Sequence, residues 1–194
     1  YAVRDFYFGI PKGQCFGMLG TDGAGKTTTL EMVAGALQPT SGTAFVAGHD
    51  VRDSGSFRRL LGYCPQDNAI FDLLTGREHL ELYCRIKGLP EESVQSMSSK
   101  MLDYLSLRKY ADQPAGTYSG GNKRKLSVAI SLIGNPPVIL LDEPSTGIDP
   151  VSRRFMWNFI SHTMVSRAVI LTTHSMEECE ALCSRLTIVV DGEM

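Results

Sequence analysis

Residues 20–27 read Gly-Thr-Asp-Gly-Ala-Gly-Lys-Thr and match the pattern Gly-x-x-x-x-Gly-Lys-[Ser/Thr] of loops that wrap nucleotide phosphates. In such a loop several backbone N–H groups converge on one polyanion, and glycines let the backbone approach it closely. Lys26 would place a positive charge on the β- and γ-phosphates, and the Thr27 hydroxyl would ligate Mg²⁺. The pattern therefore predicts a site for a nucleoside triphosphate with Mg²⁺.

The residues flanking this loop are those that a phosphate loop needs. Cys15–Leu19 reads as a short buried strand, and the segment from Thr28 reads as a helix whose apolar residues extend to Leu37 at one-face spacing. The N-terminus of that helix adds partial positive charge. The alternative is a chance glycine-rich turn, which this context disfavours. The residues expected to hold the nucleotide are Gly20, Thr21, Asp22, Gly23, Ala24, Gly25, Lys26, Thr27 and Thr28.

Two further apolar runs predict central strands of a parallel sheet covered by helices. Residues 138–141 are followed by Asp142 and Glu143, and residues 168–171 are followed by two threonines and His174. Ligands of such sheets bind beyond the carboxyl ends of the strands. Three segments could therefore deliver polar groups to one edge of an α/β fold.

The middle of the chain has a different pattern. Thr75–Glu78 is a capping-box sequence that opens a helix, Pro90 ends it, and residues 97–105 read as another helix. We expect a helical lobe at about 72–125 inserted into a core formed by about 1–71 and 126–194. The chain opens in an expected strand and loop, 1–11, and stops after an expected strand and turn, 186–192, so we interpret it as a piece of something longer.

Composition excludes several classes of function. The net charge of −2 gives no electrostatic case for a nucleic-acid partner, and no apolar run approaches the ~18 residues of a membrane span. The five cysteines contain no Cys-x-x-Cys pair, so we expect packing thiols in a reducing compartment.

A second candidate anion site precedes another predicted helix. Ser119 stands at the N-cap position, and Gly120, Gly121 and Asn122 would expose backbone N–H groups at the positive end of the helix. An ordinary capped helix start is an equal alternative for this segment taken alone.

These motifs together resemble, over essentially the whole chain, the nucleotide-binding domain of ABC transporters. Besides the phosphate loop, residues 62–66 resemble the family's glutamine loop, 118–122 its signature, 138–143 its strand ending in Asp-Glu, 145–149 its D-loop, and His174 its switch histidine. Segments 73–83, 119–127 and 174–183 look most like the A subfamily, and closest to the second of its two nucleotide-binding domains. The resemblance implies a P-loop NTPase core with a mainly parallel sheet and an inserted α-helical subdomain, here truncated at both ends.

The resemblance also implies roles in ATP hydrolysis. Asp142 would hold Mg²⁺ together with Thr27 and Gln66, and Gln66 would also take part in catalysis by contacting the attacking water. Glu143 would orient and polarise the attacking water, and His174 would contact the γ-phosphate. The alternative for His174 is a capping residue before the helix that follows.

In this family two domains dimerise head to tail, so Ser119, Gly120, Gly121 and Asn122 would serve the partner's ATP, with Asp149 in the D-loop. The partner would be a second nucleotide-binding domain, in the same polypeptide if the A-subfamily likeness holds. The expected function is an ATPase motor for transport of a lipid-like substrate, attached to transmembrane domains on the cytoplasmic face of a membrane.

Two other functions remain open. A soluble ABC-type clamp acting on DNA or ribosomes would share these motifs, but Ser119 follows Gln66 by only 53 positions, with no long coiled coil, and the chain is not basic. A domain that binds ATP without hydrolysing it is disfavoured by Glu143 and His174. Asp22 leaves room for it, because the family usually has Asn there and a carboxylate near phosphates is electrostatically unfavourable.

Overall fold

The structure, a computed structural model, describes residues 2–53 and 57–194. It divides into two compact units, one formed by residues 1–66, 136–144 and 160–194 and the other by 67–135 and 145–159. The second unit therefore takes in residues 126–135 and 145–159, which lie outside the helical lobe expected from the sequence. That lobe boundary stays a prediction.

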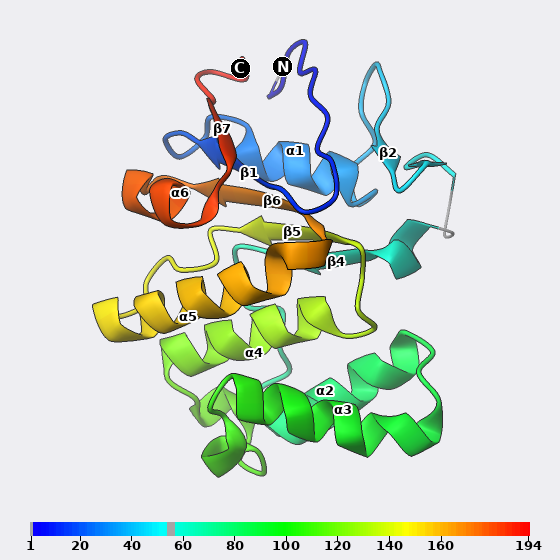
Figure 1. Ribbon diagram of the computed structural model, residues 1–194, viewed down its shortest axis with the longest axis vertical. Helices are drawn as coiled ribbons and strands as arrows, with labels where there is room; N and C mark the ends of the chain where they lie inside the picture. The colour runs from blue at the N-terminus through cyan, green and yellow to red at the C-terminus, as the bar shows by residue number, and fades with distance from the viewer. Residues whose placement is uncertain (1, 54–56) are drawn as a thin grey trace. The chain divides into compact units, whose positions relative to one another are not determined.

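A five-stranded sheet forms the centre of the first unit (Figure 1). Its order is β4 (Leu61–Cys64), β5 (Val138–Asp142), β6 (Ala168–Thr173), β1 (Cys15–Leu19) and β7 (Arg185–Ile188), and every neighbouring pair is parallel. The strands β2 (Phe45–Val46) and β3 (His49–Asp50) form a separate antiparallel pair. The predicted α/β class with a mainly parallel sheet is confirmed.

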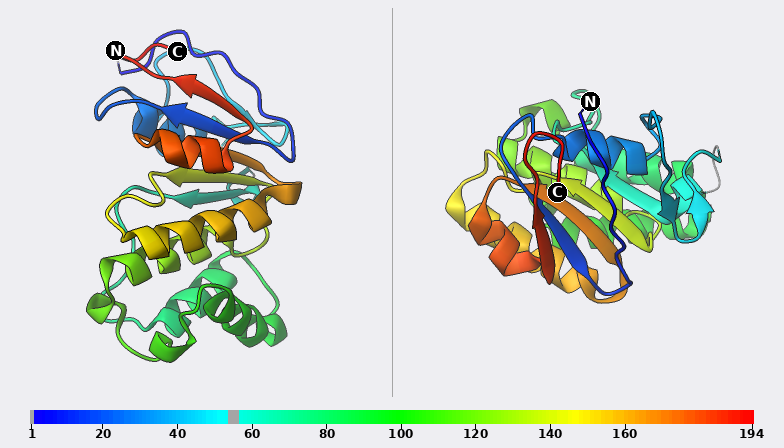
Figure 2. Two further views of the ribbon diagram at one scale, coloured as in Figure 1. Left: turned by 60° about the vertical axis from the view of Figure 1, so that its left-hand side comes forward. Right: turned by 90° about the horizontal axis from the view of Figure 1, so that it is seen from above.

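The apolar runs form central strands because both faces of the sheet are covered. The β5 and β6 residues Ile139–Leu141 and Val169–Leu171 are all buried, as expected for parallel strands between helices. Helix α1 (Lys26–Val33) contacts β5 and β6, while α6 (Met176–Leu182) contacts β1 and β6. Figure 2 shows these two helices on opposite faces of the sheet.

The strand register brings four carboxyl ends to one edge. Leu19 of β1 pairs with Thr173 of β6, Asp142 of β5 pairs with Thr172, and the last residue of β4 pairs with Leu141. Chain segments that follow these strands therefore start at the same edge of the sheet.

The two ends of the chain differ from expectation. No strand forms within residues 2–14, and the expected strand's first residue, Tyr1, lies outside the described part. The N-terminal segment instead runs beside the C-terminal one, where the Arg4 N–H donates to the Gly192 carbonyl at 2.6 Å. The expected strand near the C-terminus forms as β7 but ends at Ile188.

The second unit is helical. It contains α2 (Gly76–Ile86), α3 (Glu91–Tyr104), α4 (Gly120–Leu132) and the larger part of α5 (Pro150–Thr163). The described residues also contain four short 3₁₀ helices: Phe57–Leu60 and Met164–Ser166 in the first unit, and Arg108–Tyr110 and Ala115–Thr117 in the second. The core of the second unit joins apolar residues of α2, α3 and α4, including Leu80, Leu102 and Leu126.

The predicted start of α2 is confirmed. Thr75 is the N-cap, its side chain accepts from the Glu78 N–H at 3.2 Å, and the Glu78 carboxylate accepts from the Thr75 N–H at 2.8 Å. This backbone hydrogen bond from Thr75 holds the pKa of Glu78 below its ordinary value. The reciprocal pair is a complete capping box.

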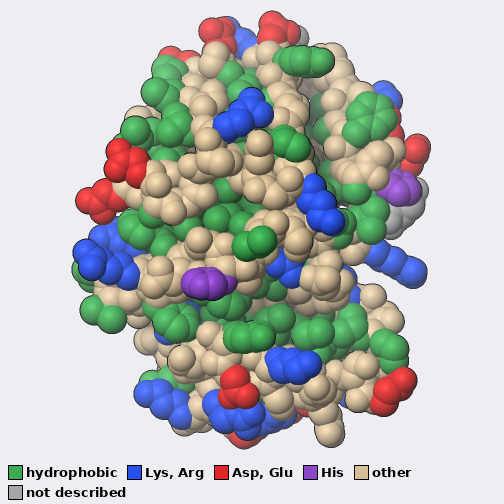
Figure 3. All heavy atoms as spheres, in the orientation of Figure 1, with side chains coloured by type: hydrophobic (Ala, Val, Ile, Leu, Met, Phe, Trp, Pro, Cys, Tyr) green, Lys and Arg blue, Asp and Glu red, His purple; other side chains and the backbone are tan. Residues whose placement is uncertain are grey.

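The surface is chemically mixed. On the face in Figure 3, acidic and basic side chains are scattered among apolar and polar ones, in keeping with the small net charge. Within residues 2–53 and 57–194, no helix combines the length and apolar character that crossing a bilayer requires.

Candidate active site

The phosphate loop connects β1 to α1 as the sequence predicts. Gly25 is the N-cap of α1 with φ of +100°, a left-handed conformation that favours glycine, and an added Cβ would collide with the Ala2 carbonyl oxygen. Because glycine has no side chain to cap the helix, the N-terminus of α1 can present its backbone N–H groups to an anion.

Lys26 is buried at this N-terminus with its ammonium facing the loop. Its Nζ donates to the carbonyls of Gly20 at 2.8 Å and Thr21 at 2.9 Å. It also lies 3.6 Å from Oε1 of Glu143, and both side chains are only 4% exposed. The phosphate loop and the end of β5 are therefore joined by a buried ion pair.

Asp142 and Glu143 are held at the end of β5 by Thr172 of the neighbouring strand. The Thr172 hydroxyl donates to Oδ1 of Asp142, while its hydroxyl and carbonyl oxygens both accept from the Glu143 N–H at 3.1 Å. Glu143 has a φ of +48°, which is uncommon for a residue with a side chain. Thr172 thus positions both acidic residues, a role that sequence reasoning missed although the two threonines at the end of β6 were a visible signal.

His174 follows β6, and its ring meets Glu143. Its Nδ1 lies 2.8 Å from Oε2 of Glu143, and 53% of its side chain is exposed. The N-cap of α6 is the next residue, Ser175, whose hydroxyl accepts from the Glu178 N–H at 3.4 Å. Capping is thus carried out by Ser175, and the His174 ring is available at the sheet edge.

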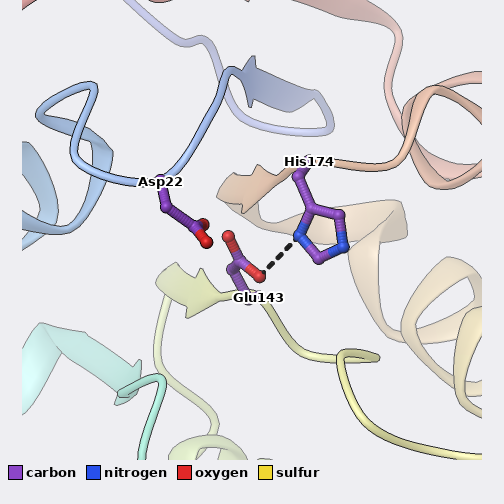
Figure 4. Close-up of side chains that lie close together, drawn as sticks. All are labelled: Asp22, Glu143 and His174. Atoms are coloured by element: carbon purple, nitrogen blue, oxygen red, sulfur yellow. Dashed lines mark hydrogen bonds and ion pairs between the residues drawn. The ribbon is translucent and has the colours of Figure 1, made fainter.

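Asp22 joins this group from the phosphate loop. One potential ligand atom from each of Asp22, Glu143 and His174 lies within 4.8 Å of the others. Figure 4 shows the three side chains pointing toward one another from the loop after β1, the end of β5 and the end of β6. Three segments far apart in the sequence therefore meet at one edge, with Lys26 beside them.

The residues expected to hold Mg²⁺ offer the right chemistry. Thr27 lies in the first turn of α1, Asp142 is fully buried at the end of β5, and Gln66 is exposed just after β4. A hydroxyl, a carboxylate and an amide oxygen are hard oxygen donors, which Mg²⁺ prefers. This donor set fits the ion.

The signature and D-loop residues lie in the second unit. The Ser119 hydroxyl accepts from the Asn122 N–H at 3.3 Å, and Ser119 and Gly120 are exposed. Ser119 is therefore the N-cap of α4, as its position in the sequence predicts. Asp149 accepts from the N–H groups of Val151 and Ser152 at 3.0 Å each, and these hydrogen bonds, led by Ser152, hold its pKa below the ordinary value.

The cysteines pack as thiols. None of the five forms a disulfide, and Sγ of Cys15 lies 3.7 Å from Sγ of Cys183. The Cys183 thiol and burial raise the pKa of Cys179 far above its ordinary value, and the Cys15 thiol and burial do the same for the pKa of Cys183. Thiols in this state are poor nucleophiles.

The chain matches one family model and is similar to several curated proteins. Residues 3–146 match the model of the ABC transporter family. The chain is 57% identical over 193 residues to "ATP-binding cassette sub-family A member 7" of Rattus norvegicus, 98% of this chain and 9% of that protein. It is 55% identical to "Phospholipid-transporting ATPase ABCA7" of Homo sapiens and to "Retinal-specific phospholipid-transporting ATPase ABCA4" of Bos taurus, again over 98% of this chain and 9% and 8% of those proteins. The chain thus spans less than a tenth of the length of these relatives.

Solved structures have the same fold. A dimeric bacterial ABC transporter cassette matches with a TM-score of 0.92 at 24% identity, covering all of this chain and 88% of the other. A dimeric post-hydrolysis cassette bound to ADP and phosphate matches equally well. The chain therefore belongs to the ABC transporter family, as a nucleotide-binding domain of the A-subfamily type.

Proposed function

We propose that this chain is the ATP-binding and ATP-hydrolysing motor domain of an ABC transporter that moves a lipid-like substrate. The observation that carries the proposal is the continuous contact from Lys26 through Glu143 to His174 at the carboxyl edge of the sheet. A phosphate-binding cation, a carboxylate that can orient water and an imidazole that can donate a hydrogen bond are groups that phosphoryl transfer to water can use.

Each residue has a role that follows from its place. The N-terminus of α1 and Lys26 would bind the phosphates, and Lys26 would exchange its contacts with the Gly20 and Thr21 carbonyls for the phosphate oxygens. Glu143 would accept a hydrogen bond from the attacking water and orient it. His174 would donate a hydrogen bond to the γ-phosphate as charge develops there.

Thr27, Asp142 and Gln66 would hold Mg²⁺. The ion would neutralise charge on the β- and γ-phosphates when bound. Asp142 is suited to this role because Thr172 keeps one of its oxygens hydrogen-bonded and the carboxylate in place.

The signature, Ser119 to Asn122, of which Ser119 and Gly120 are exposed, would close over the ATP of a second nucleotide-binding domain. Dimeric neighbours in the same fold support this arrangement. We propose that the partner lies in the same polypeptide, that this chain is the second of its two nucleotide-binding domains, and that transmembrane domains receive the motion on the cytoplasmic face. ATP would then favour the closed dimer because the γ-phosphate contacts form only there.

The class of substrate is inferred from relatives. Two similar proteins carry names that describe them as phospholipid-transporting ATPases. At 55% identity over 98% of this chain, a shared class of cargo is the simplest proposal.

The test is Glu143→Gln in the complete protein. The amide keeps the size of the side chain but cannot polarise water, so we expect ATP turnover to fall by about 10²–10⁴-fold while ATP binding persists. Turnover is measured as phosphate release and binding as ATP retained after rapid filtration. The matched control is Glu180→Gln, an exposed change on α6.

Unchanged turnover in Glu143→Gln would remove Glu143 from catalysis. If the unaltered protein retained ATP without releasing phosphate, the domain would be a binding-only regulator instead of a motor.

A further inference from the structure

We propose that Asp22, Glu143 and His174 form a binding site for a divalent transition-metal ion of the Zn²⁺ class when no nucleotide is bound. This donor set differs from the one expected for Mg²⁺, which consists of Thr27, Asp142 and Gln66. The metal site therefore shares the edge of the sheet with the nucleotide site but uses other side chains.

The distances are close to those of a coordinated ion. The three candidate ligand atoms lie within 4.8 Å of one another. Zn–N and Zn–O bonds of about 2.0–2.2 Å place tetrahedral ligands roughly 3.4 Å apart. Asp22 and His174 are exposed, so rotation of their side chains can bring the ligand atoms to the separation that a bound ion requires. An ion can also reach the site from solvent.

Glu143 provides the fixed point of the site. It is 4% exposed, and its backbone N–H is held by two oxygens of Thr172. A buried carboxylate with a fixed backbone loses little conformational freedom when a ligand binds. Only two of the three ligands must therefore be ordered by the ion.

The donor types select the kind of ion. Two carboxylates and one imidazole suit Zn²⁺, Co²⁺ or Fe²⁺, whereas Mg²⁺ prefers oxygen ligands alone. His174 contributes through Nδ1, the atom that faces Oε2 of Glu143 at 2.8 Å. The ion takes the position of the proton in that hydrogen bond, and the neutral ring keeps its remaining proton on Nε2.

The charges near the site favour a dication. Asp22 and Glu143 carry two negative charges, and the Lys26 ammonium, 3.6 Å from Oε1 of Glu143, offsets one of them. Lys26 is held on the other side by the Gly20 and Thr21 carbonyls. The attraction between two charges is proportional to the product of the charges. The remaining negative charge therefore attracts Zn²⁺ more strongly than a monovalent cation.

A bound ion would hold the two groups that the proposed function assigns to hydrolysis. Zn²⁺ should therefore inhibit ATP turnover, and the inhibition should be weaker in Asp22→Asn than in the unaltered protein. The predicted inhibition by Zn²⁺ rests on the proposed function. Metal binding does not, because it is measured without nucleotide.

The test is a titration of the nucleotide-free complete protein with Co²⁺, whose visible absorption reports its ligands. We expect a Co²⁺ band that Zn²⁺ removes and excess Mg²⁺ does not. Mutating a residue that hydrogen-bonds to a metal ligand typically lowers metal affinity by about 10–100-fold. Asp22→Asn removes a ligand itself, so we expect it to weaken Co²⁺ binding at least about tenfold. His174→Ala should also shift the band.

The matched control is Asp53→Asn, which makes the same change at another exposed position in the first unit and should leave the titration unaltered. Identical Co²⁺ spectra and affinities for Asp22→Asn and the unaltered protein would overturn the site, as would displacement of Co²⁺ by Mg²⁺. If His174→Ala does not fold, the nearly isosteric Asp22→Asn decides alone. If the Co²⁺ titration disproves the metal site, the proposed function is unaffected. The Glu143→Gln experiment measures ATP hydrolysis and not the binding of a free metal ion.

Discussion

Thr172 connects the two acidic residues at the end of β5. Its hydroxyl donates to the Asp142 carboxylate and accepts from the Glu143 N–H. Hydrogen bonds to a buried charge contribute more than those between neutral groups, because the charge has lost its water. One hydroxyl from β6 thus supports a candidate metal ligand and the candidate water-orienting residue together.

Thr172→Val should destabilise the first unit by about 2 kcal/mol. Valine keeps the β-branched shape that suits a strand, so the loss reports the hydroxyl and not the volume. The measurement is the free energy of unfolding of residues 1–194 in urea. The control is Thr187→Val on β7, where the side chain is only half-buried and a change below about 0.5 kcal/mol is expected. Equal losses for the two variants would contradict the role given to Thr172.

Residue types and spacing predicted the location of the site better than its contacts. The loop pattern and two strand ends were enough to place Lys26, Glu143 and His174 near one edge, because parallel strands end on the same side. They were not enough to predict the left-handed backbone of Glu143 or the approach of Asp22 to His174. Those details depend on side-chain rotamers and cross-strand contacts, which a motif does not encode.

A capping box between Thr75 and Glu78 determines where helix α2 begins. Thr75 and Glu78 satisfy each other's backbone N–H groups, and apolar residues such as Leu80 then enter the core of the second unit. The capping box therefore sets where the helix begins, and the apolar residues set which face is buried.

Thr75→Ala should lower the free energy of unfolding of the second unit by about 1 kcal/mol, since an N-cap hydroxyl is lost. The comparison is Ser96→Ala, an exposed position inside α3. There alanine should be neutral or slightly stabilising, because it is the better helix former. Opposite signs in urea unfolding of the same chain distinguish the cap from a general effect of removing hydroxyls. Stabilisation by Thr75→Ala would mean that the cap contributes nothing.

Elements with strong local signals were predicted closely, and those that depend on distant contacts were not. Strands β1, β5 and β6 lie where their apolar runs predict. Helix α1 starts at Lys26, two residues before the expected Thr28, because the loop turns into the helix at Gly25. It ends at Val33, so Leu37, expected on its buried face, is 44% exposed.

At the scale of the whole chain, the motifs expected to contact nucleotide are divided between the two units. The phosphate loop and Glu143 belong to the first, whereas the signature and Asp149 belong to the second. The signature residues Ser119 and Gly120 are exposed. The sequence predicts the signature in the helical lobe but Asp149 in the core, and the assembly that would complete the site needs a second domain.

Ser119→Arg tests the composite site in the complete protein. A bulky cation at the exposed N-cap of α4 would keep the partner's nucleotide from the helix N-terminus. ATP would still bind at Lys26 of the same chain. We therefore expect a photoreactive ATP analogue to label residues 1–194 as before, while ATP turnover falls at least about tenfold, since a positioned donor of this kind contributes that much to hydrolysis. Ser96→Arg, on the exposed face of α3, should alter neither. Loss of labelling confined to the mutated domain, with the partner domain still labelled, would show that its signature serves its own nucleotide.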